Sequence, residues 1–138
     1  MNIARLIFAI VAAFVAIFAT DLLIHEFWLA PEYKASAALW RPESQMMSLF
    51  HLMLLAQFLC ALMFVLIWAK GFSGRDIATG LVFGIMMALF QQIWAIAIYV
   101  VMPLPGSLAV KWFFSGIVQL AIVGMIVAAI YKPAARSL

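Results

Sequence analysis

Acidic and imidazole side chains interrupt an otherwise apolar run near the N-terminus, in the stretch TDLLIHEFWLAPEY. Asp21 and His25 stand four residues apart, so a helix places them on one face and within mutual reach. Further along the chain, His51 follows Ser44 and Ser48 at spacings of four and three, which form a polar stripe on a second helix. Carboxylate and imidazole groups together can bind a metal ion or pass a proton, so the elements that carry them decide the chemistry.

Composition indicates that these elements lie in a membrane. The chain of 138 residues is 70% apolar and 9% charged, with a mean hydropathy of +1.22, whereas soluble proteins average roughly 25% charged residues. Short connections join the apolar runs, which makes successive helices antiparallel neighbours. We predict an all-α fold in one domain, residues 1–138: a four-helix transmembrane bundle of up-down topology. Each helix exceeds the roughly 20 residues that span a bilayer, and the four cover residues 3–29, 46–69, 77–102 and 108–131.

The first of these runs begins like a secretory signal peptide. Arg5 precedes an apolar stretch, and Ala19 supplies a small residue of the kind found at cleavage sites. Because the hydrophobic run continues past Thr20 to Leu29, we interpret it as the first membrane helix.

The distribution of basic residues predicts the orientation of the bundle. Under the positive-inside rule, the side that collects more Lys and Arg faces the cytoplasm, which places both termini there. The predicted cytoplasmic side holds Arg5, Lys70, Arg75, Lys132 and Arg136, and the other side holds Lys34, Arg41 and Lys111.

The predicted span lengths bring the acidic and imidazole groups to one level. If the first helix enters the membrane near Leu6, about 20 residues reach the outer boundary near His25, with Asp21 about one turn deeper and Glu26 at the interface. His51 lies about one turn inside the antiparallel second helix. We therefore predict a polar site of Asp21, His25 and His51, with Glu26 as an outer charge.

Several chemistries suit that set of residues, and the sequence leaves them open. Mixed nitrogen and oxygen donors suit zinc or another divalent transition metal, with Asp21, His25, His51 and Glu26 as the ligands. The same groups could relay protons. Two histidines could ligate a haem, although direct neighbours in a tight bundle leave little room for one. In a purely structural interpretation, Asp21 is hydrogen-bonded to a histidine and locks two helices together.

Small and amide side chains predict close contacts between the helices. Gln57, Gln91, Gln92 and Gln119 fall near mid-membrane, where cross-helix hydrogen bonds are worth roughly 0.6–2 kcal/mol each. Trp94, also at mid-membrane, is expected to pack inside the bundle. Ridges of small residues predict internal packing or an oligomer interface; they comprise Gly80, Gly84 and Ala88, then Ala121, Gly124 and Ala128, and finally Ala9, Ala13, Ala16 and Thr20.

No catalytic motif is present, so we predict a protein that is not an enzyme. The basic residues stand singly at the ends of the runs, which does not favour nucleic acid as a partner. The predicted function is a membrane protein with a polar site near the outer face that binds or passes a small cation or proton. The alternative is an accessory or assembly subunit that packs against a larger membrane complex or another copy of itself.

Three stretches of the chain resemble small uncharacterised bacterial inner-membrane proteins of four helices. They are DLLIHEFWLAPEY, LWRPESQM and the closing LAVKWFFSGIVQLAIVGMIVAAIYKP. The resemblance implies the four-span architecture and a bacterial inner membrane, and it carries over no catalytic residue.

Overall fold

The computed structural model describes residues 2–72 and 74–132, and every element in those ranges is helical. Four helical segments are long and apolar enough to cross a membrane. In each of them, between 17 and 39% of the most apolar stretch is buried by the rest of the chain. So much uncovered apolar surface suits lipid rather than water as the surrounding solvent. The four segments are Ile3–Trp28, Phe50–Gly71, Ile77–Val101 and Gly106–Ile130.

The first predicted run is not one uniform α-helix. Helix α1 (Ile3–Asp21) continues into a wider π-helical segment, η1 (Leu22–Trp28), in which the amide of Leu29 bonds to the carbonyl of Ile24. After it come α2 (Ala30–Ala35) and the short 3₁₀-helix η2 (Ala37–Leu39).

The second predicted run is broken at Leu49 into α3 (Glu43–Ser48) and α4 (Phe50–Gly71). Two uninterrupted helices, α5 (Ile77–Val101) and α6 (Gly106–Ile130), complete the fold close to their predicted bounds.

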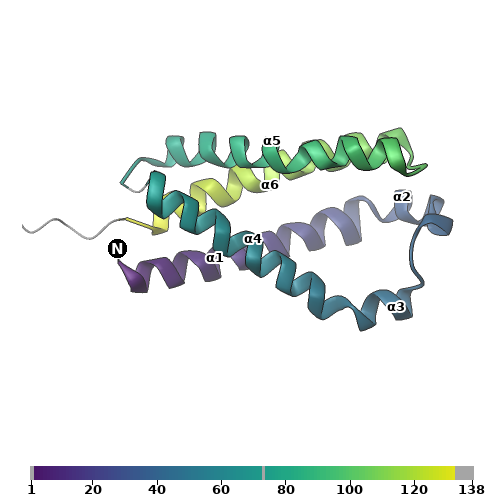
Figure 1. Cartoon of the computed structure of the whole chain (residues 1–138), viewed down its shortest axis with the longest axis horizontal. Coiled ribbons are helices and arrows are strands. Elements are labelled where there is room, and N and C mark those ends of the chain that lie inside the picture. Colours follow the sequence, from purple (N-terminus) through teal and green to yellow (C-terminus); the bar gives the residue numbers. More distant parts are fainter. Residues whose placement is uncertain (1, 73, 133–138) are drawn as a thin grey trace, which may run out of the picture.

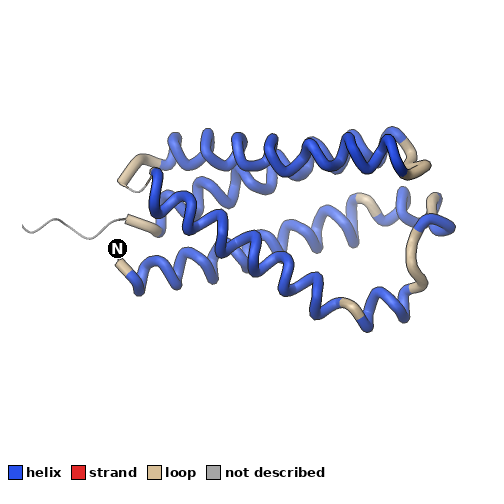
Figure 2. Tube along the Cα trace, viewed as in Figure 1, coloured by secondary structure: helices blue, strands red, loops and turns tan. Residues whose placement is uncertain are grey.

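The helices run lengthwise between two ends of the molecule. We call the end with α2, η2 and residues 102–105 the Tyr33 end, and the opposite end, with Asn2, Gly71 and Tyr131, the terminal end (Figure 1). Loops are confined to these two ends and to the break before α4 (Figure 2). Helices α5 and α6 lie side by side along their whole length, whereas α4 crosses α1 and diverges from it toward α3 (Figure 1).

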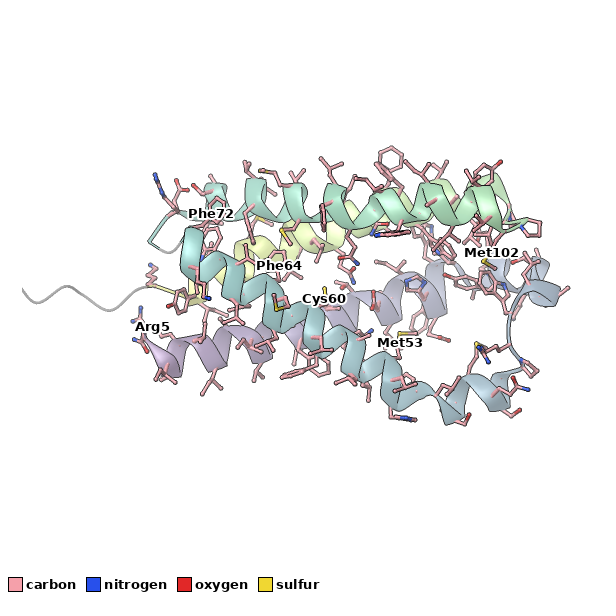
Figure 3. The ribbon with its side chains drawn as sticks, in the orientation of Figure 1. Arg5, Met53, Cys60, Phe64, Phe72 and Met102 are labelled. Atoms are coloured by element: carbon pink, nitrogen blue, oxygen red, sulfur yellow. The ribbon has the colours of Figure 1, made fainter. Side chains whose placement is uncertain are left out.

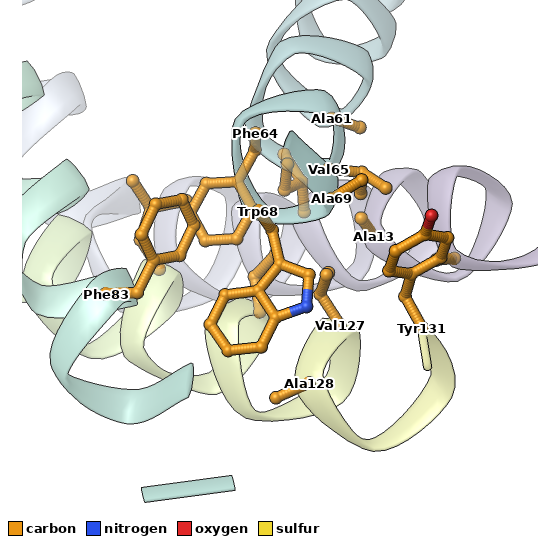
Figure 4. Packing of buried hydrophobic residues seen from close by; sticks show 14 of the residues in the cluster. Ala13, Ala61, Phe64, Val65, Trp68, Ala69, Phe83, Val127, Ala128 and Tyr131 are labelled. Carbon is orange, nitrogen blue, oxygen red and sulfur yellow. The ribbon is translucent and has the colours of Figure 1, made fainter. Parts of the chain in front are cut away.

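The main core lies at the terminal end, where all four long helices meet. Trp68 is fully buried there and packs against Phe83, whose ring centroid lies 5.4 Å away (Figure 4). Tyr131 and Ala13, from α6 and α1, close the same cluster. Toward the Tyr33 end a smaller cluster, formed by Leu29, Leu104 and Leu108, joins the loops to α6.

Glycines bring α5 and α6 into backbone contact. A Cβ atom added at Gly84 would overlap the carbonyl oxygen of Leu120 and lie 2.9 Å from the Cα of Ala121. A Cβ at Gly80 would lie 2.5 Å from the Cβ of Ala128. The small-residue ridges of α5 and α6 therefore serve internal packing, as small residues do where membrane helices approach closely. The ridge of α1 is also used internally, since Ala9 and Ala13 are fully buried.

Helix α4 is buried over only half of its length. Its buried residues begin at Ala61, and no residue of α3 is buried. Met53 lies on the diverging part of the helix, between Cys60 and α3 (Figure 3). The expectation that Trp94 packs inside the bundle is wrong, because 69% of this residue is exposed. Helix α5 turns Gly80 and Gly84 toward α6 and most of its large residues outward, although Phe83 is buried against Trp68.

Candidate functional site

Asp21 is the last residue of α1 and stands where the helix widens into η1. A π-helical turn arises where an extra residue is accommodated in a helix, and such turns recur at functional sites. The main core ends at the level of Ile17. Asp21 therefore lies between that core and the smaller cluster of Leu29, Leu104 and Leu108 toward the Tyr33 end.

Two amides from other helices bond to the carboxylate of Asp21. The Nε2 of Gln57 on α4 donates to Oδ2 at 2.6 Å, and the Nε2 of Gln119 on α6 lies 2.6 Å from Oδ1. Gln119 is buried, and its Nε2 also lies 2.7 Å from the hydroxyl of Thr20. Asp21 thus links α1 to α4 and to α6. The prediction that these two glutamines bond across helices is confirmed.

No Lys or Arg in the described residues lies within ion-pair distance of Asp21. The nearest basic group is His25, whose Nε2 lies 4.0 Å from Oδ1. The side chain of Asp21 is 28% exposed and that of His25 is 42% exposed. The carboxylate is therefore held by neutral donors and is accessible from outside the fold.

His25 continues a hydrogen-bonded chain toward the Tyr33 end. Its Nδ1 lies 2.5 Å from the hydroxyl of Tyr33, and the Nε1 of Trp112 lies 2.8 Å from the same hydroxyl. An indole N–H can only donate, so the hydroxyl oxygen accepts from Trp112 and its proton is left for Nδ1 of His25. By this assignment, neutral His25 carries its own proton on Nε2, the nitrogen that faces Asp21.

Tyr33 is suited to remain the donor in this chain. Burial raises the pKa of its phenol above the ordinary value of 10.0, although the bond from Trp112 acts in the opposite direction. The hydroxyl therefore stays protonated at neutral pH. The indole of Trp40 packs edge-on against the Tyr33 ring, with centroids 5.4 Å apart, and donates to the hydroxyl of Ser36 at 3.0 Å.

The structure brings together two of the four residues proposed from the sequence. Asp21 and His25 are near each other, whereas Glu26 is exposed on η1 and His51 is exposed on the diverging first turn of α4. Within residues 2–72 and 74–132, no three His, Cys, Asp or Glu side chains form a group that could hold a metal ion. The expected meeting of His51 with Asp21 does not occur, because α4 crosses α1 instead of running alongside it.

Sequence reasoning missed two features of this site. It placed Gln57 and Gln119 near mid-membrane but did not connect them to Asp21, because their depth was counted on straight, parallel helices. It also gave Tyr33 no part in the site. The sequence signal for the position of Tyr33 is Pro31. A proline is common in the first turn of a helix, and Pro31 stands at the second position of α2, which begins directly after η1.

Comparison with known proteins adds no further constraint: no family model, no curated protein and no solved structure matches this chain. The geometry alone therefore defines the candidate chemistry. It consists of one carboxylate, two amides and a hydroxyl, with His25 4.0 Å from the carboxylate and hydrogen-bonded to Tyr33.

Proposed function

We propose that this chain is a small non-enzymatic membrane protein that binds a proton or a small hard cation at Asp21. The observation that carries the proposal is a carboxylate, on a helical segment apolar enough to cross a membrane, whose bonded partners are two neutral amides. An ionisable group at such depth is costly unless a charge of opposite sign accompanies it. Because residues 2–72 and 74–132 place no Lys or Arg within ion-pair distance of Asp21, an ion from solution supplies the positive charge.

The remaining hydrogen-bonding capacity of the cluster also favours a positively charged guest. A carboxylate offers about four lone-pair positions, of which the two amides fill two. The Oε1 atom of Gln57 is buried and has no hydrogen-bond partner in the described structure. Free acceptor positions on carboxylate and amide oxygens suit a proton donor or a cation that prefers oxygen ligands.

The tautomer of His25 argues against a transition metal held between it and Asp21. A ring nitrogen that carries a proton has no lone pair for a metal, and Nε2 is the protonated nitrogen when Tyr33 donates to Nδ1. Before Nε2 of His25 could bind zinc, its proton would have to move to Nδ1, and Nδ1 would then donate to the Tyr33 hydroxyl instead of accepting from it. A proton or an oxygen-preferring cation needs no such change.

For the setting of this site, we propose a bilayer in which the Tyr33 end faces outward and both termini lie in the cytoplasm. The basic residues at the terminal end support this orientation under the positive-inside rule. In this arrangement of the up-down bundle, half-buried His25 and exposed Glu26 lie on the path between outside water and Asp21. A bacterial inner membrane is the proposed location.

An accessory or assembly role is the second candidate, and the exposed part of α4 favours it. Eight of the ten residues 50–59 of α4 are apolar, the exceptions being His51 and Gln57, and none of the ten is buried. Asp21→Asn is expected to leave the chains that co-purify with the protein unchanged. Under the accessory role, Met53→Lys on the exposed part of α4 removes those chains.

Labelling the aspartate side chains tests the ion site directly. The chain has two aspartates, Asp21 and Asp76, so protein with ¹³C at the aspartate carboxyl carbons gives two NMR signals. In lipid bilayers, the Asp21 signal is expected to move when the pH is lowered or when Na⁺, K⁺ or Mg²⁺ is added at constant ionic strength. The Asp76 signal comes from an exposed carboxylate and serves as the control: it shows how far pH and added salt shift a carboxylate that has no binding site.

Matched variants complete the experiment. Asp21→Asn is expected to abolish the specific response, and Asp76→Asn, the same chemical change at an exposed site, is expected to retain it. A response that only Zn²⁺ produces, together with a shift of the His25 ring nitrogens, would replace the proposed ligand by a transition metal. If no ion and no pH moves the Asp21 signal, the proposal is wrong.

A further inference from the structure

We propose that the groove between η1 and α6 holds one acyl chain of a phospholipid whose phosphate group is bound by Lys111. The groove is open along one side and has a volume of about 330 Å³. Its walls are almost entirely apolar, with Ile24 and Trp28 on one side and Phe114, Val118 and Ile122 on the other. Thr20 and Gln119 of the Asp21 cluster also line the groove, so the two sites adjoin. The lipid proposal nevertheless does not require that Asp21 bind an ion.

Lys111 and the groove, whose α6 wall runs from Phe114 to Ile122, together cover about the depth of one leaflet of a bilayer. Lys111, Ser115, Val118 and Ile122 follow one another at spacings of three and four on a single face of α6. The helical rise from Lys111 to Ile122 is about 16 Å at 1.5 Å per residue. That rise is about half of a hydrocarbon core roughly 30 Å thick, which is the depth that one lipid chain occupies.

A cation stands at the interfacial end of this groove. The Nζ atom of Lys111 lies 5.5 Å from the ring centroid of Trp28, a residue of the groove wall, and forms an ion pair with Glu32. An ammonium group has three N–H donors, and 33% of the Lys111 side chain remains exposed. Lys111 can therefore donate to a phosphate oxygen while it stays paired. Trp beside Lys at the headgroup level is the arrangement that membrane interfaces favour.

The dimensions favour a lipid chain over a helix from a second protein. A helix about 10 Å wide occupies on the order of 1,200 Å³ over 16 Å of length, several times the volume of the groove. Only single side chains of such a helix would enter. A flexible chain of methylene groups fits the narrow space and gains about 0.8 kcal/mol for each CH₂ that it removes from water.

Native mass spectrometry after reconstitution tests this site. The protein is incorporated into bilayers of phosphatidylethanolamine that contain a minor fraction of diacylglycerol with the same chains, and is then released into detergent. We expect one phospholipid to remain on each chain, and diacylglycerol, which lacks the phosphate, to be retained about tenfold less.

Two groove variants and one control sharpen the result. Val118→Trp fills the groove and is expected to lower phospholipid retention about tenfold, whereas Val82→Trp, the same change on an exposed part of α5, retains it. Replacing Lys111 and Glu32 together by Gln removes the ion pair without leaving an unpaired charge. This variant is expected to retain phospholipid and diacylglycerol equally.

Three outcomes overturn the proposal. In the first, the wild-type protein carries no lipid. In the second, all variants retain phospholipid equally. In the third, Val118→Trp changes the number of chains in the complex, which assigns the groove to a second copy. Thermal unfolding of each variant in the same detergent identifies any variant that fails to fold. Val118→Phe, a smaller filling, then takes the place of the Trp variant.

Discussion

The two halves of α4 are equally apolar, yet they have different surroundings. In the half toward the terminal end, Phe64, Val65 and Trp68 are almost completely buried among α1, α5 and α6. In the half toward the Tyr33 end, residues 50–59 have no buried member. Because lipid tails are as apolar as these side chains, hydropathy does not distinguish a helix face that meets protein from one that meets lipid. Shape and hydrogen bonding decide between them.

The same contrast holds for the bundle as a whole. At the terminal end, small residues such as Gly84 and Ala13 allow backbones to approach, and van der Waals contact holds the helices together. Toward the Tyr33 end, where the buried apolar cluster is smaller, specific polar bonds add to the packing. Asp21 connects three helices, and Tyr33 connects η1 to α6 through His25 and Trp112. The packed half supplies rigidity, and the open half leaves polar groups accessible.

The largest effect is expected from removing a large side chain from the packed half. Trp68→Ala is expected to lower the free energy of unfolding by about 3–5 kcal/mol, because Trp68 is fully buried and the structure cannot close over the space. Trp94→Ala removes the same group from a lipid-facing position and is expected to cost less than about 1 kcal/mol. Titration of the folded protein in mixed micelles with a denaturing detergent measures both. Equal losses would mean that the two halves do not differ in packing.

A smaller effect is expected from adding one methyl group between α5 and α6. Gly84→Ala forces the two backbones apart and is expected to cost about 1–3 kcal/mol. Gly71→Ala is the matched control, because an added Cβ at the end of α4 meets no atom within 4 Å. The same micelle titration compares them. If Gly84→Ala proves as stable as wild type, α5 and α6 are not in the close contact described.

Much of the fold could be predicted from the sequence, because long apolar runs and turn residues leave few alternatives to four membrane helices. The site was predicted less well, for reasons that lie in particular residues. The positions of Asp21 and His25 at spacing four were sufficient to place them near each other. The separation of His51 from them depends on the crossing of α4 over α1 and on the break at Leu49, which no local pattern signals.

The side of a helix that faces lipid was the hardest feature to predict. Trp94 was expected inside the bundle because a large aromatic residue at mid-membrane usually packs. Four of the five buried residues of α5 are small, namely Gly80, Gly84, Ala88 and Ala95, and Phe83 is its one buried large residue, so the small residues mark most of its buried face. In a water-soluble protein, large apolar residues would instead mark the buried face of a helix.

The smallest effect is expected at the start of a helix and depends on pH. At the terminal end, side chains cap α1 and α5: Asn2 accepts from the amide of Arg5, and Asp76 accepts from the amide and the hydroxyl of Thr79. Toward the Tyr33 end, α4 and α6 begin at Leu49 and Pro105 without a side-chain cap. The helices that begin at the packed terminal end therefore have side-chain caps, and α4 and α6, which begin toward the Tyr33 end, do not.

The bonds from Thr79 lower the pKa of the Asp76 carboxyl below its ordinary value of 3.8. A lowered folded-state pKa means that the ionised group stabilises the fold above pH 3.8, and that this contribution is lost as the pH falls through the folded-state value. Asp76→Asn keeps a capping side chain but cannot ionise. The difference in stability between wild type and Asp76→Asn is therefore expected to be constant near neutral pH and to decline below pH 3.8. Unfolding titrations of both proteins between neutral pH and pH 2 measure that difference. A difference that does not change with pH would show that the cap at the packed end acts by hydrogen-bond geometry alone, as a neutral amide does.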